Sequence, residues 1–474
     1  MANEPNNVVP GRLDLSGRRP RLELGGALFA FMKEVPSAPG VSAFVEADDP
    51  PDSTVHGVLM GSVRSVTVFN ARRLRLNAAV MSIMSARPNE GLQEEVLEGD
   101  YAVLGAHVAD GEEFFDAFDF RLRHQDAWAE HSGLSMKVDT TGKRRVTFEY
   151  VNPDAVLVPL ADDAGTLSLD AEASVSPLRV GGAYVDTRTR LKVMLNTPIS
   201  IHDAWVRFVI PASSLLTMLN AKECPPIAFR VRSATQRWCT VHIAGLGIDT
   251  SDVRSTKLPE APLMSRRQLG LERLAAWFEL AERLTPLPQL IAGAFEASDR
   301  SVQNLLLELA TAAEGLHRKL YPDARKLSKE QRDTGLEAVA DLDIDRDTKQ
   351  ALHTALKLYL WEPSFPQRLK VLAEDVVVAA PDVTGKTNRW RDAVRDARNG
   401  FAHDPTSPPS SNDAIFGYHV LQMSLRWVLT ARLLLELGVA PAELAARFSK
   451  YRRYEQFLKN AARDLPRVYG SSAG

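Results

Sequence analysis

The most constraining feature of this 474-residue chain is a change in the spacing of its apolar residues about halfway along. Up to about residue 248, apolar and polar residues alternate in short runs such as 145–150, a pattern typical of half-buried strands. From about residue 268 onward, apolar residues recur every three or four positions, as in amphipathic helices. The chain is therefore expected to be an α+β multidomain protein, with a β-rich domain followed by an all-α helical bundle.

Clusters of Gly, Asp, Asn and Pro separate the short strands of the first half. Strands are expected at residues 63–68, 145–150, 155–160, 190–195, 227–231 and 240–243. Many short strands at this spacing favour an antiparallel sandwich or barrel. One helix, at about residues 213–221, is expected to interrupt the strands.

A polar segment with two prolines separates the two patterns, and we expect residues 252–264 to form a linker. The polar, Pro-rich residues 1–20 are expected to be a disordered tail, which places the two domains at 21–251 and 265–474. Helices of the second domain are expected at residues 268–283, 302–320, 329–340, 348–358, 368–378, 390–403, 413–437 and 442–462. Gly438 is placed to end the long apolar helix before it.

Charge and cysteine content restrict the classes of function. The formal net charge is −3, so any surface that binds nucleic acid must be local. Cys224 and Cys239 are too few for a disulfide framework, and no Cys/His cluster has the spacing of a zinc site. The N-terminus lacks the apolar segment of a signal peptide, and the most apolar stretch, 425–437, contains two arginines. We therefore expect a cytoplasmic protein without a membrane span, a metal or a cofactor.

The stretch 390–403 carries the residues suited to chemistry. Four of its apolar residues share one side of a helix, which we expect to face the core: Trp390, Val394, Ala397 and Phe401. Asn399 and His403 are four residues apart and share a face roughly opposite to that side. Arg398 lies about 140° from His403 around an ideal helix. Either its long side chain swings partway round, or a second copy of the chain brings another arginine and histidine to a shared groove.

The setting of His403 favours proton exchange. We expect the helix to end near His403, because Asp404 precedes Pro405 and the residue before a proline avoids helical dihedrals. The negative end of the helix dipole and the Asp404 carboxylate both favour the protonated imidazole. The pKa of His403 is therefore expected to permit proton transfer near neutral pH. A buried core histidine and a surface histidine without a role are the alternative interpretations.

The segment Arg398-Asn-Gly-Phe-Ala-His403 is similar to the R-N-x-x-x-H motif of HEPN ribonucleases. Two segments before it resemble parts of the ApeA-like HEPN group. One is the stretch 304–321, which contains Glu314-Gly-Leu-His-Arg318, and the other is Ser364-Phe-Pro-Gln-Arg-Leu369. The long helix that ends at Gly438 resembles the final helix of that group.

The first half of the chain resembles the same group. Residues 56–68 are similar to its early pair of strands, and residues 101–107 and 115–128 are similar to its G-x-H…F…W stretch. The resemblance covers the chain from about residue 20 to about residue 440. In this group the fold is expected to be a β-rich N-terminal domain followed by a HEPN-like helical bundle.

The resemblance implies RNA cleavage without a metal, usually within bacterial antiphage defence by abortive infection. RNA carries its own nucleophile, the 2′-OH. His403 is then the candidate general base or acid, Arg398 the phosphate clamp, and Asn399 the residue that orients either of them. The expected products are a 2′,3′-cyclic phosphate and a 5′-OH. The resemblance also implies a homodimer with two motifs at a symmetric interface.

Several other polar residues permit two interpretations. Four basic residues precede the motif and are candidate RNA contacts: Lys386, Arg389, Arg391 and Arg395. Asp392 and Asp396 interleave with them, so a solvated face with local ion pairs explains them as well. Glu314 and His317 lie off the apolar stripe of their helix, either in a groove or on an exposed face. In the basic segment 450–459, packing of the aromatic residues on the domain is favoured over stacking on bases.

The resulting hypothesis is an RNA endonuclease whose substrate is tRNA or another structured RNA. Its N-terminal domain either senses an unknown phage-derived trigger or restrains the nuclease. The alternative is a non-catalytic, HEPN-like dimeric module that binds RNA or protein. A third hypothesis is that the motif region is the target of a modifying partner, as in toxin–antitoxin pairs.

Overall fold

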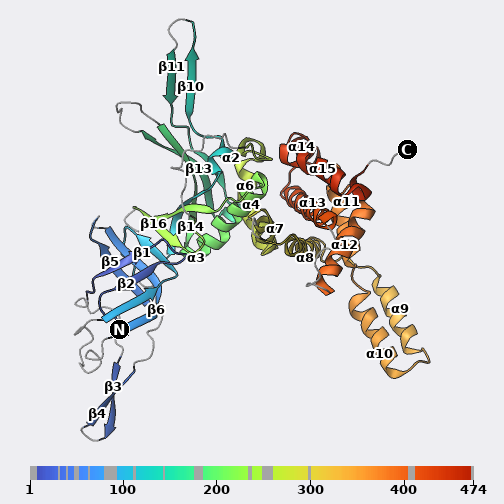
Figure 1. Cartoon of the computed structure of the whole chain (residues 1–474), viewed down its shortest axis with the longest axis horizontal. Helices are drawn as coiled ribbons and strands as arrows, with labels where there is room; N and C mark the ends of the chain where they lie inside the picture. The colour runs from blue at the N-terminus through green and yellow to red at the C-terminus, as the bar shows by residue number, and fades with distance from the viewer. Residues whose placement is uncertain are drawn as a thin grey trace. The chain divides into compact units, whose positions relative to one another are not determined.

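The computed structural model describes residues 8–29, 32–38, 41–46, 53–61, 64–78, 93–109, 114–141, 145–175, 185–232, 237–247, 260–296, 300–403 and 412–470. Contacts within the chain divide it into two compact units (Figure 1). The β unit comprises residues 1–123, 131–209 and 225–257, and the helical unit comprises residues 124–130, 210–224 and 258–474. The expected architecture, a β-rich N-terminal part followed by a helical C-terminal part, is confirmed.

The β unit is built on one large antiparallel sheet. The strands of this unit are β1 (Gly11–Asp14), β2 (Arg21–Leu24), β3 (Met32–Ala38), β4 (Val41–Glu46), β5 (Ser53–Leu59), β6 (Arg64–Ala78), β7 (Gln93–Glu98), β8 (Tyr101–Leu104), β9 (Phe114–Leu122), β10 (Leu134–Asp139), β11 (Arg145–Tyr150), β12 (Val156–Pro159), β13 (Gly165–Val175), β14 (Val185–Ser200), β15 (Pro226–Arg232) and β16 (Trp238–Ile243). Among the described residues, twelve strands join in the order β1-β2-β7-β6-β8-β16-β15-β9-β14-β13-β12, with β5 paired to β6. Two further pairs, β3–β4 and β10–β11, are separate hairpins. Each of the six strands expected from the sequence overlaps an observed one.

Alternation along the strands gives the sheet an apolar face and a charged face. Phe118 on β9 and Leu191 on β14 are fully buried, whereas the side chains one residue away lie on the other face. There the Asp119 carboxylate accepts hydrogen bonds from Arg230 Nη2 at 2.6 Å and from Arg190 Nη1 at 3.1 Å. Burial raises the pKa of Asp119, and the two guanidinium groups only partly oppose that rise. Asp119, Arg190 and Arg230 are called the β-unit ion cluster below.

The structure corrects the expected N-terminal tail. Residues 11–14, which fall within the expected tail 1–20, form β1 and pair antiparallel with β2. The physical reason is apolar burial, since Leu13 packs against a core cluster that contains the buried Leu22. Residues 1–7 lie outside the described part of the chain.

The helical unit contains most of the helices. Its elements are α2 (Gln125–Ala129), α4 (Ile210–Asn220), α5 (Arg266–Leu269), α6 (Leu271–Leu284), α7 (Leu287–Glu296), α8 (Val302–Leu320), α9 (Lys329–Ala340), α10 (Arg346–Thr354), η3 (Ala355–Tyr359), α11 (Phe365–Val376), α12 (Thr387–His403), α13 (Asn412–Glu436), α14 (Pro441–Phe448), α15 (Arg452–Asp464) and α16 (Pro466–Tyr469). The short helices η1 (Ala161–Asp163), α3 (Ile201–Ala204) and η2 (Trp205–Val209) belong to the β unit. Within the described part of the chain, no helix combines the length and the apolarity needed to cross a bilayer.

Helix α4 was expected as an interruption among the strands, and by its contacts it belongs to the helical unit. Every residue from Pro211 to Asn220 is buried, and α4 packs against α6 and α7. A helix that is buried all round needs partners on several sides, and other helices supply some of them. Trp277 Nε1 on α6 donates a hydrogen bond to the Pro211 carbonyl at 2.8 Å. Most of the expected linker 252–264 lies outside the described residues.

The end of the chain differs from the single helix expected at 442–462. Two helices, α14 and α15, replace it, with a turn at Ser449–Lys450 and an extended residue at Tyr451. The break allows three aromatic rings to pack around Trp427 of α13, with ring centroids 5.8–5.9 Å away: Phe448, Tyr451 and Tyr454. The expectation that the aromatic residues of this segment pack on the domain is confirmed, since Tyr454 and Phe457 are buried.

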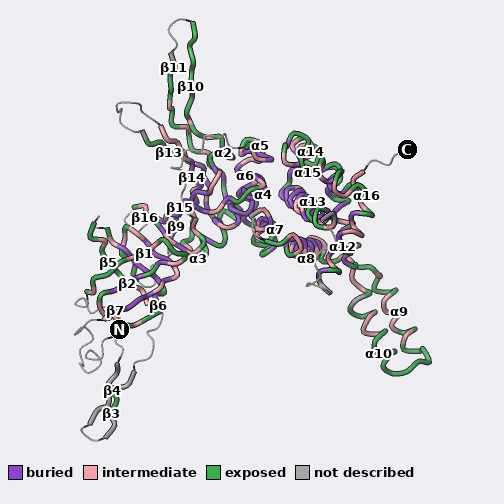
Figure 2. The backbone as a smooth tube through the Cα atoms, in the orientation of Figure 1, coloured by how far each residue is buried: buried purple, intermediate pink, exposed green. Residues whose placement is uncertain are grey.

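Helix α13 is the central element of the helical unit. It packs against α7, α8, α11, α12 and α15, and Figure 2 shows buried residues along much of its length. Gly438 follows it with φ at +83°, a conformation that glycine adopts without strain, so the expected helix end is confirmed. The arrangement leaves α8, α11 and α12 packed against one another beside α13, and these helices carry the candidate site.

Candidate active site

Helix α12 carries the predicted motif, and one side of this helix is a buried apolar stripe. Its four expected core residues, Trp390, Val394, Ala397 and Phe401, are all buried. Asn399 is exposed, as expected for a residue opposite that stripe. The helix runs to His403, as predicted, but the side chain of His403 and residues 404–411 lie outside the described part of the chain. The exposure of His403 and its expected pKa therefore remain predictions.

Arg398 turns toward two neighbouring helices. Its Nη2 donates to Glu314 Oε2 on α8 at 3.1 Å, and its guanidinium carbon lies 4.4 Å from the centre of the Phe365 ring on α11. A cation over an aromatic face is attracted by the ring's quadrupole, so Phe365 and Glu314 hold the guanidinium from two directions. The Arg398 side chain is still 32% exposed, which leaves part of the guanidinium accessible to a ligand.

Glu314 on helix α8 pairs with Arg398 and connects it to further charged residues toward the core. Glu314 also accepts a bond from Arg318 Nη2 at 3.2 Å, and Arg318 Nη1 contacts Glu362 at 2.9 Å. His317 is 1% exposed, which contradicts both interpretations offered from the sequence, a groove and an exposed face. It is buried because α8 packs against α11 and α13, and Arg368 of α11 reaches it.

The pairing of His317 with Arg368 fixes the protonation of the imidazole. Arg368 Nη1 lies 3.1 Å from His317 Nδ1, and since a guanidinium only donates, Nδ1 accepts. Burial, assisted by the adjacent Arg368 charge, lowers the pKa of His317 to about 4. His317 is therefore neutral at physiological pH and unsuited to neutral-pH proton transfer.

The segment Ser364–Leu369 assembles the other side of the site. Ser364 and Gln367 form a capping box that starts α11, with Ser364 N donating to Gln367 Oε1 at 2.8 Å. This cap places Phe365 beneath Arg398 and directs Arg368, which is 3% exposed, toward His317 and Glu362. Three segments that lie far apart in the sequence thus meet around one arginine.

Two family models match the chain. The model described as ApeA N-terminal domain 1 matches residues 2–237, and the model described as Apea-like HEPN matches residues 307–443. The chain belongs to the ApeA-like HEPN family. The comparison with curated proteins gave no match, and neither did the comparison with solved structures. The HEPN match contains Glu314, Phe365 and Arg398, so the network lies inside the matched domain.

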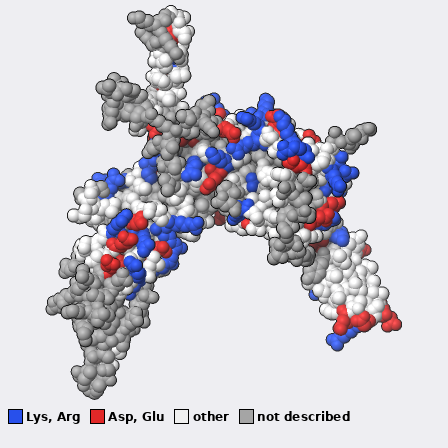
Figure 3. Space-filling model, in the orientation of Figure 1, with Lys and Arg blue, Asp and Glu red and all other residues white. Residues whose placement is uncertain are grey.

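The basic residues before the HEPN motif differ in their contacts. Arg391 and Arg395 both contact Asp392, at 3.0 and 3.2 Å, which agrees with a solvated face of local ion pairs. Arg389 is exposed, and its Nη1 donates to the Arg467 carbonyl at 3.0 Å. Within the described part of the chain, no acid pairs with Arg389, unlike the other two. Figure 3 shows basic and acidic side chains interspersed over the helical unit.

A second network in this HEPN domain was not foreseen from the sequence. Arg432 on α13 contacts Asp375 of α11 at 3.3 Å and Glu436 at 3.1 Å, and its Nη2 donates to Tyr321 at 3.2 Å. Tyr321 in turn donates to Asp375. Arg432 and Glu436 are four residues apart on one helix, but periodicity gives no signal for the contacts among Tyr321, Asp375 and Arg432, which are more than fifty residues apart in the sequence.

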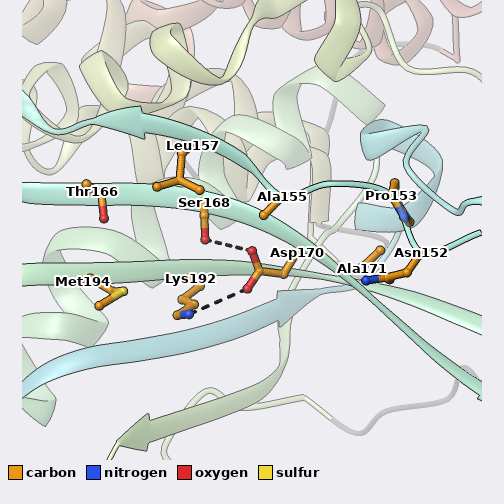
Figure 4. Close-up of a pocket in the computed structure, with 10 residues that line it drawn as sticks. All are labelled: Asn152, Pro153, Ala155, Leu157, Thr166, Ser168, Asp170, Ala171, Lys192 and Met194. Atoms are coloured by element: carbon orange, nitrogen blue, oxygen red, sulfur yellow. Dashed lines mark hydrogen bonds and ion pairs between the residues drawn. The ribbon is translucent and has the colours of Figure 1, made fainter.

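The β unit of this family member contains a shallow groove of about 350 Å³ on strands β12 to β14 (Figure 4). Ser168 donates to Asp170 at 3.0 Å, and Lys192 Nζ lies 3.9 Å from the same carboxylate. Leu157 and Met194 supply apolar walls. The groove offers binding contacts rather than an obvious acid–base pair. Among the described residues of the whole chain, no group of three or more His, Cys, Asp or Glu side chains is placed to hold a metal ion.

Proposed function

We propose that the helical unit is an endoribonuclease that acts through the 2′-OH of its RNA substrate and needs no metal. One observation carries the proposal. Arg398, the first residue of the R-N-x-x-x-H motif, is held in a fixed orientation by Glu314 and Phe365 while its guanidinium remains partly accessible. The family adds support, since HEPN domains are typically ribonucleases.

In the proposed reaction, the 2′-OH attacks the adjacent phosphorus, and the 5′-oxygen of the next nucleotide leaves. His403 removes the 2′-OH proton and returns a proton to the leaving oxygen. Arg398 neutralises the negative charge that develops on the phosphorane oxygens. Its bond to Glu314 occupies one of the five N–H donors of a guanidinium. Asn399 orients the phosphate or the imidazole, and the products are a 2′,3′-cyclic phosphate and a 5′-OH.

The test of this activity compares wild-type protein with Arg398→Ala and His403→Ala in the cleavage of total cellular RNA. We expect each variant to lose roughly 100- to 10,000-fold in rate, the range for removal of an acid–base or charge-stabilising group. Sequencing of RNA ends after capture of 2′,3′-cyclic phosphates measures the product. Arg300→Ala serves as a control, because Arg300 is an exposed arginine paired with Glu308 outside the site. Equal cleavage by all four proteins would remove the assignment.

We further propose that the protein works as a homodimer in which each site combines Arg398 of one protomer with His403 of the other. The supporting observation is that Arg398 is held by α8 and α11 of its own chain, which restricts its swing around α12. Mixing Arg398→Ala with His403→Ala protein then restores one complete site per heterodimer. Activity should recover to roughly a quarter of wild type in an equal mixture, because half of the dimers are mixed and each has one of two sites. A mixture as inactive as its components would show that each site lies within one protomer.

We also propose which residues contact the RNA, which RNA is cut, and in which process the protein acts. Lys386, Arg389, Arg391 and Arg395 are proposed to guide the RNA backbone, with Arg389 contributing most because no acid among the described residues pairs with it. The proposed substrate is tRNA or another structured RNA.

The β unit is proposed to sense a phage-derived trigger or to restrain cleavage in antiphage defence by abortive infection. Plaque counts on cells with wild-type or Arg398→Ala protein test this, and equal counts across a broad phage panel would contradict it.

A second candidate function is a non-catalytic dimeric module that binds RNA or protein. The observation that favours it is the ion pair of Arg398 with Glu314, since an arginine already paired serves a structural role equally well. Protein that binds RNA as a dimer but yields no cyclic-phosphate ends would support this function.

A further inference from the structure

The guanidinium of Arg398 is surrounded by side chains that are not part of the R-N-x-x-x-H motif. Glu314 reaches it from α8, and Phe365 supports it from α11. The two contacts differ in direction, because one is a hydrogen bond to the edge of the guanidinium plane and the other lies against its carbon. Together they restrict both the position of the group and the tilt of its plane.

Glu314 is itself held in place by a chain of ion pairs that ends in the core. Arg318 contacts both Glu314 and Glu362, and Glu362 accepts from Arg368 at 2.7 Å. Arg368 is buried and bound to the buried His317. The carboxylate that orients Arg398 is therefore connected to the buried Arg368 through two side chains, Arg318 and Glu362, that are 52% and 39% exposed.

The charges in this series of ion pairs suit a site that binds phosphate. A lone carboxylate beside a phosphate-binding arginine would repel the substrate, but here Arg318 compensates Glu314 and Arg368 compensates Glu362. With His317 neutral, three arginines and two glutamates leave one positive charge. Arg398 is the member at the motif end of the chain, with a third of its side chain exposed, and can therefore present that charge to a ligand.

Stability alone gives a weak reason for the Glu314–Arg398 pair. Both side chains are partly exposed, and ion pairs in such positions contribute little to folding. An arginine that is already oriented, however, loses less freedom when it meets a phosphate and is better placed for the transition state. A contact that contributes little to folding can thus contribute much to the rate of a reaction that depends on orientation.

We propose that Glu314 is a positioning residue for RNA cleavage, which orients the Arg398 guanidinium toward the scissile phosphate and remains bound to it through the reaction. Phe365 supports the same orientation from below. This inference rests on the endoribonuclease function proposed above. Glu314 acts through Arg398 and has no contact with the reacting atoms.

The experiment measures kcat and KM for RNA cleavage by wild type, Glu314→Gln, Glu314→Asp and a control, Glu308→Gln. Glu308 lies on the same helix and pairs with Arg300 outside the site. We expect Glu314→Gln to lower kcat about tenfold with little change in KM, because orientation matters most in the transition state. Glu314→Asp keeps the charge but is one methylene shorter, so we expect a loss of about threefold on the same grounds. Glu308→Gln should match wild type, and all four should unfold at the same temperature.

The outcomes separate this inference from the function on which it rests. Wild type that cuts RNA, with Glu314→Gln equal to it in kcat, overturns the inference and leaves the nuclease intact. A Glu314→Gln variant that cuts faster also overturns it, since Glu314 would then restrain Arg398. If Glu314→Gln does not fold, Glu314→Asp decides, and a wild-type kcat for that variant contradicts positioning. Wild type that cuts no RNA removes the proposed function and this inference together.

Discussion

Both units contain arginine–carboxylate networks, and the two networks differ in where they end. The β-unit ion cluster centres on Asp119, whose side chain is 3% exposed between Arg190 and Arg230, and both arginines also pair with Glu172, which is 46% exposed. The network of the helical unit starts at the buried Arg368 and ends at Arg398, which is 32% exposed. The network of the β unit thus ends in a carboxylate that two arginines already pair with, whereas the network of the helical unit ends in an arginine that an anionic ligand can bind.

The difference shows how a stabilising network can be told apart from a candidate site when both consist of arginines and carboxylates. In the β-unit ion cluster, burial dominates and raises the pKa of Asp119 despite its two arginine partners. At the inner end of the network of the helical unit, burial lowers the pKa of His317 to about 4. The comparison can therefore be tested by removing Asp119 from the β-unit ion cluster and by titrating His317 in the helical unit.

The largest expected effect on stability is that of Asp119→Ala. The change removes the buried partner of Arg190 and Arg230 and leaves them the partly exposed Glu172, so we expect a cost of about 3 kcal/mol, the lower end for breaking a buried ion pair. Hydrogen exchange of peptides from β9, β14 and β15, read by mass spectrometry, measures the loss within the β unit. Glu314→Gln is the matched comparison in the helical unit and should cost less than about 1 kcal/mol. Equal protection in wild type and Asp119→Ala would show that the β-unit ion cluster does not stabilise the sheet in solution.

Sequence spacing was sufficient to predict the helix that carries the motif. The buried stripe of α12 and the exposure of Asn399 follow from about 100° per residue and need no knowledge of neighbouring helices. The end of α13 before Gly438 was predictable for a similar reason, since the φ of +83° suits glycine and few other residues.

The contacts of the candidate site were not predictable in the same way. His317 lies off the apolar stripe of α8, and spacing alone assigned it to a groove or an exposed face. Its burial depends on Arg368, which lies 51 residues away in the sequence. Likewise, Arg398 was expected to swing around α12 or to meet a second protomer, and its contacts with Glu314 and Phe365 depend on how three helices pack. Helix α4 shows the same limit, because the sequence predicted the helix but not the helices that bury it.

The buried inner end of the helical-unit network makes stability depend on pH through His317. Its pKa is about 4 in the folded chain and about 6.5 when exposed, so the unfolded chain binds a proton first as the pH falls. The contribution of neutral His317 is therefore complete above about pH 6.5 and is lost progressively between that value and pH 4. Between pH 7 and pH 5 we expect a loss of about 2 kcal/mol in the free energy of unfolding of the helical unit.

His317→Gln isolates this effect from the other groups that titrate in the same range. A glutamine keeps an acceptor for Arg368 but takes up no proton, so the fall in stability from pH 7 to pH 5 should be smaller in the variant by about the same 2 kcal/mol. Urea unfolding at the two pH values, followed by hydrogen exchange in peptides from α8 and α11, supplies the comparison. The same decline in both proteins would place His317 in contact with water. The inner end of the network would then be exposed as well, and the series of ion pairs from Glu314 would not end in the core.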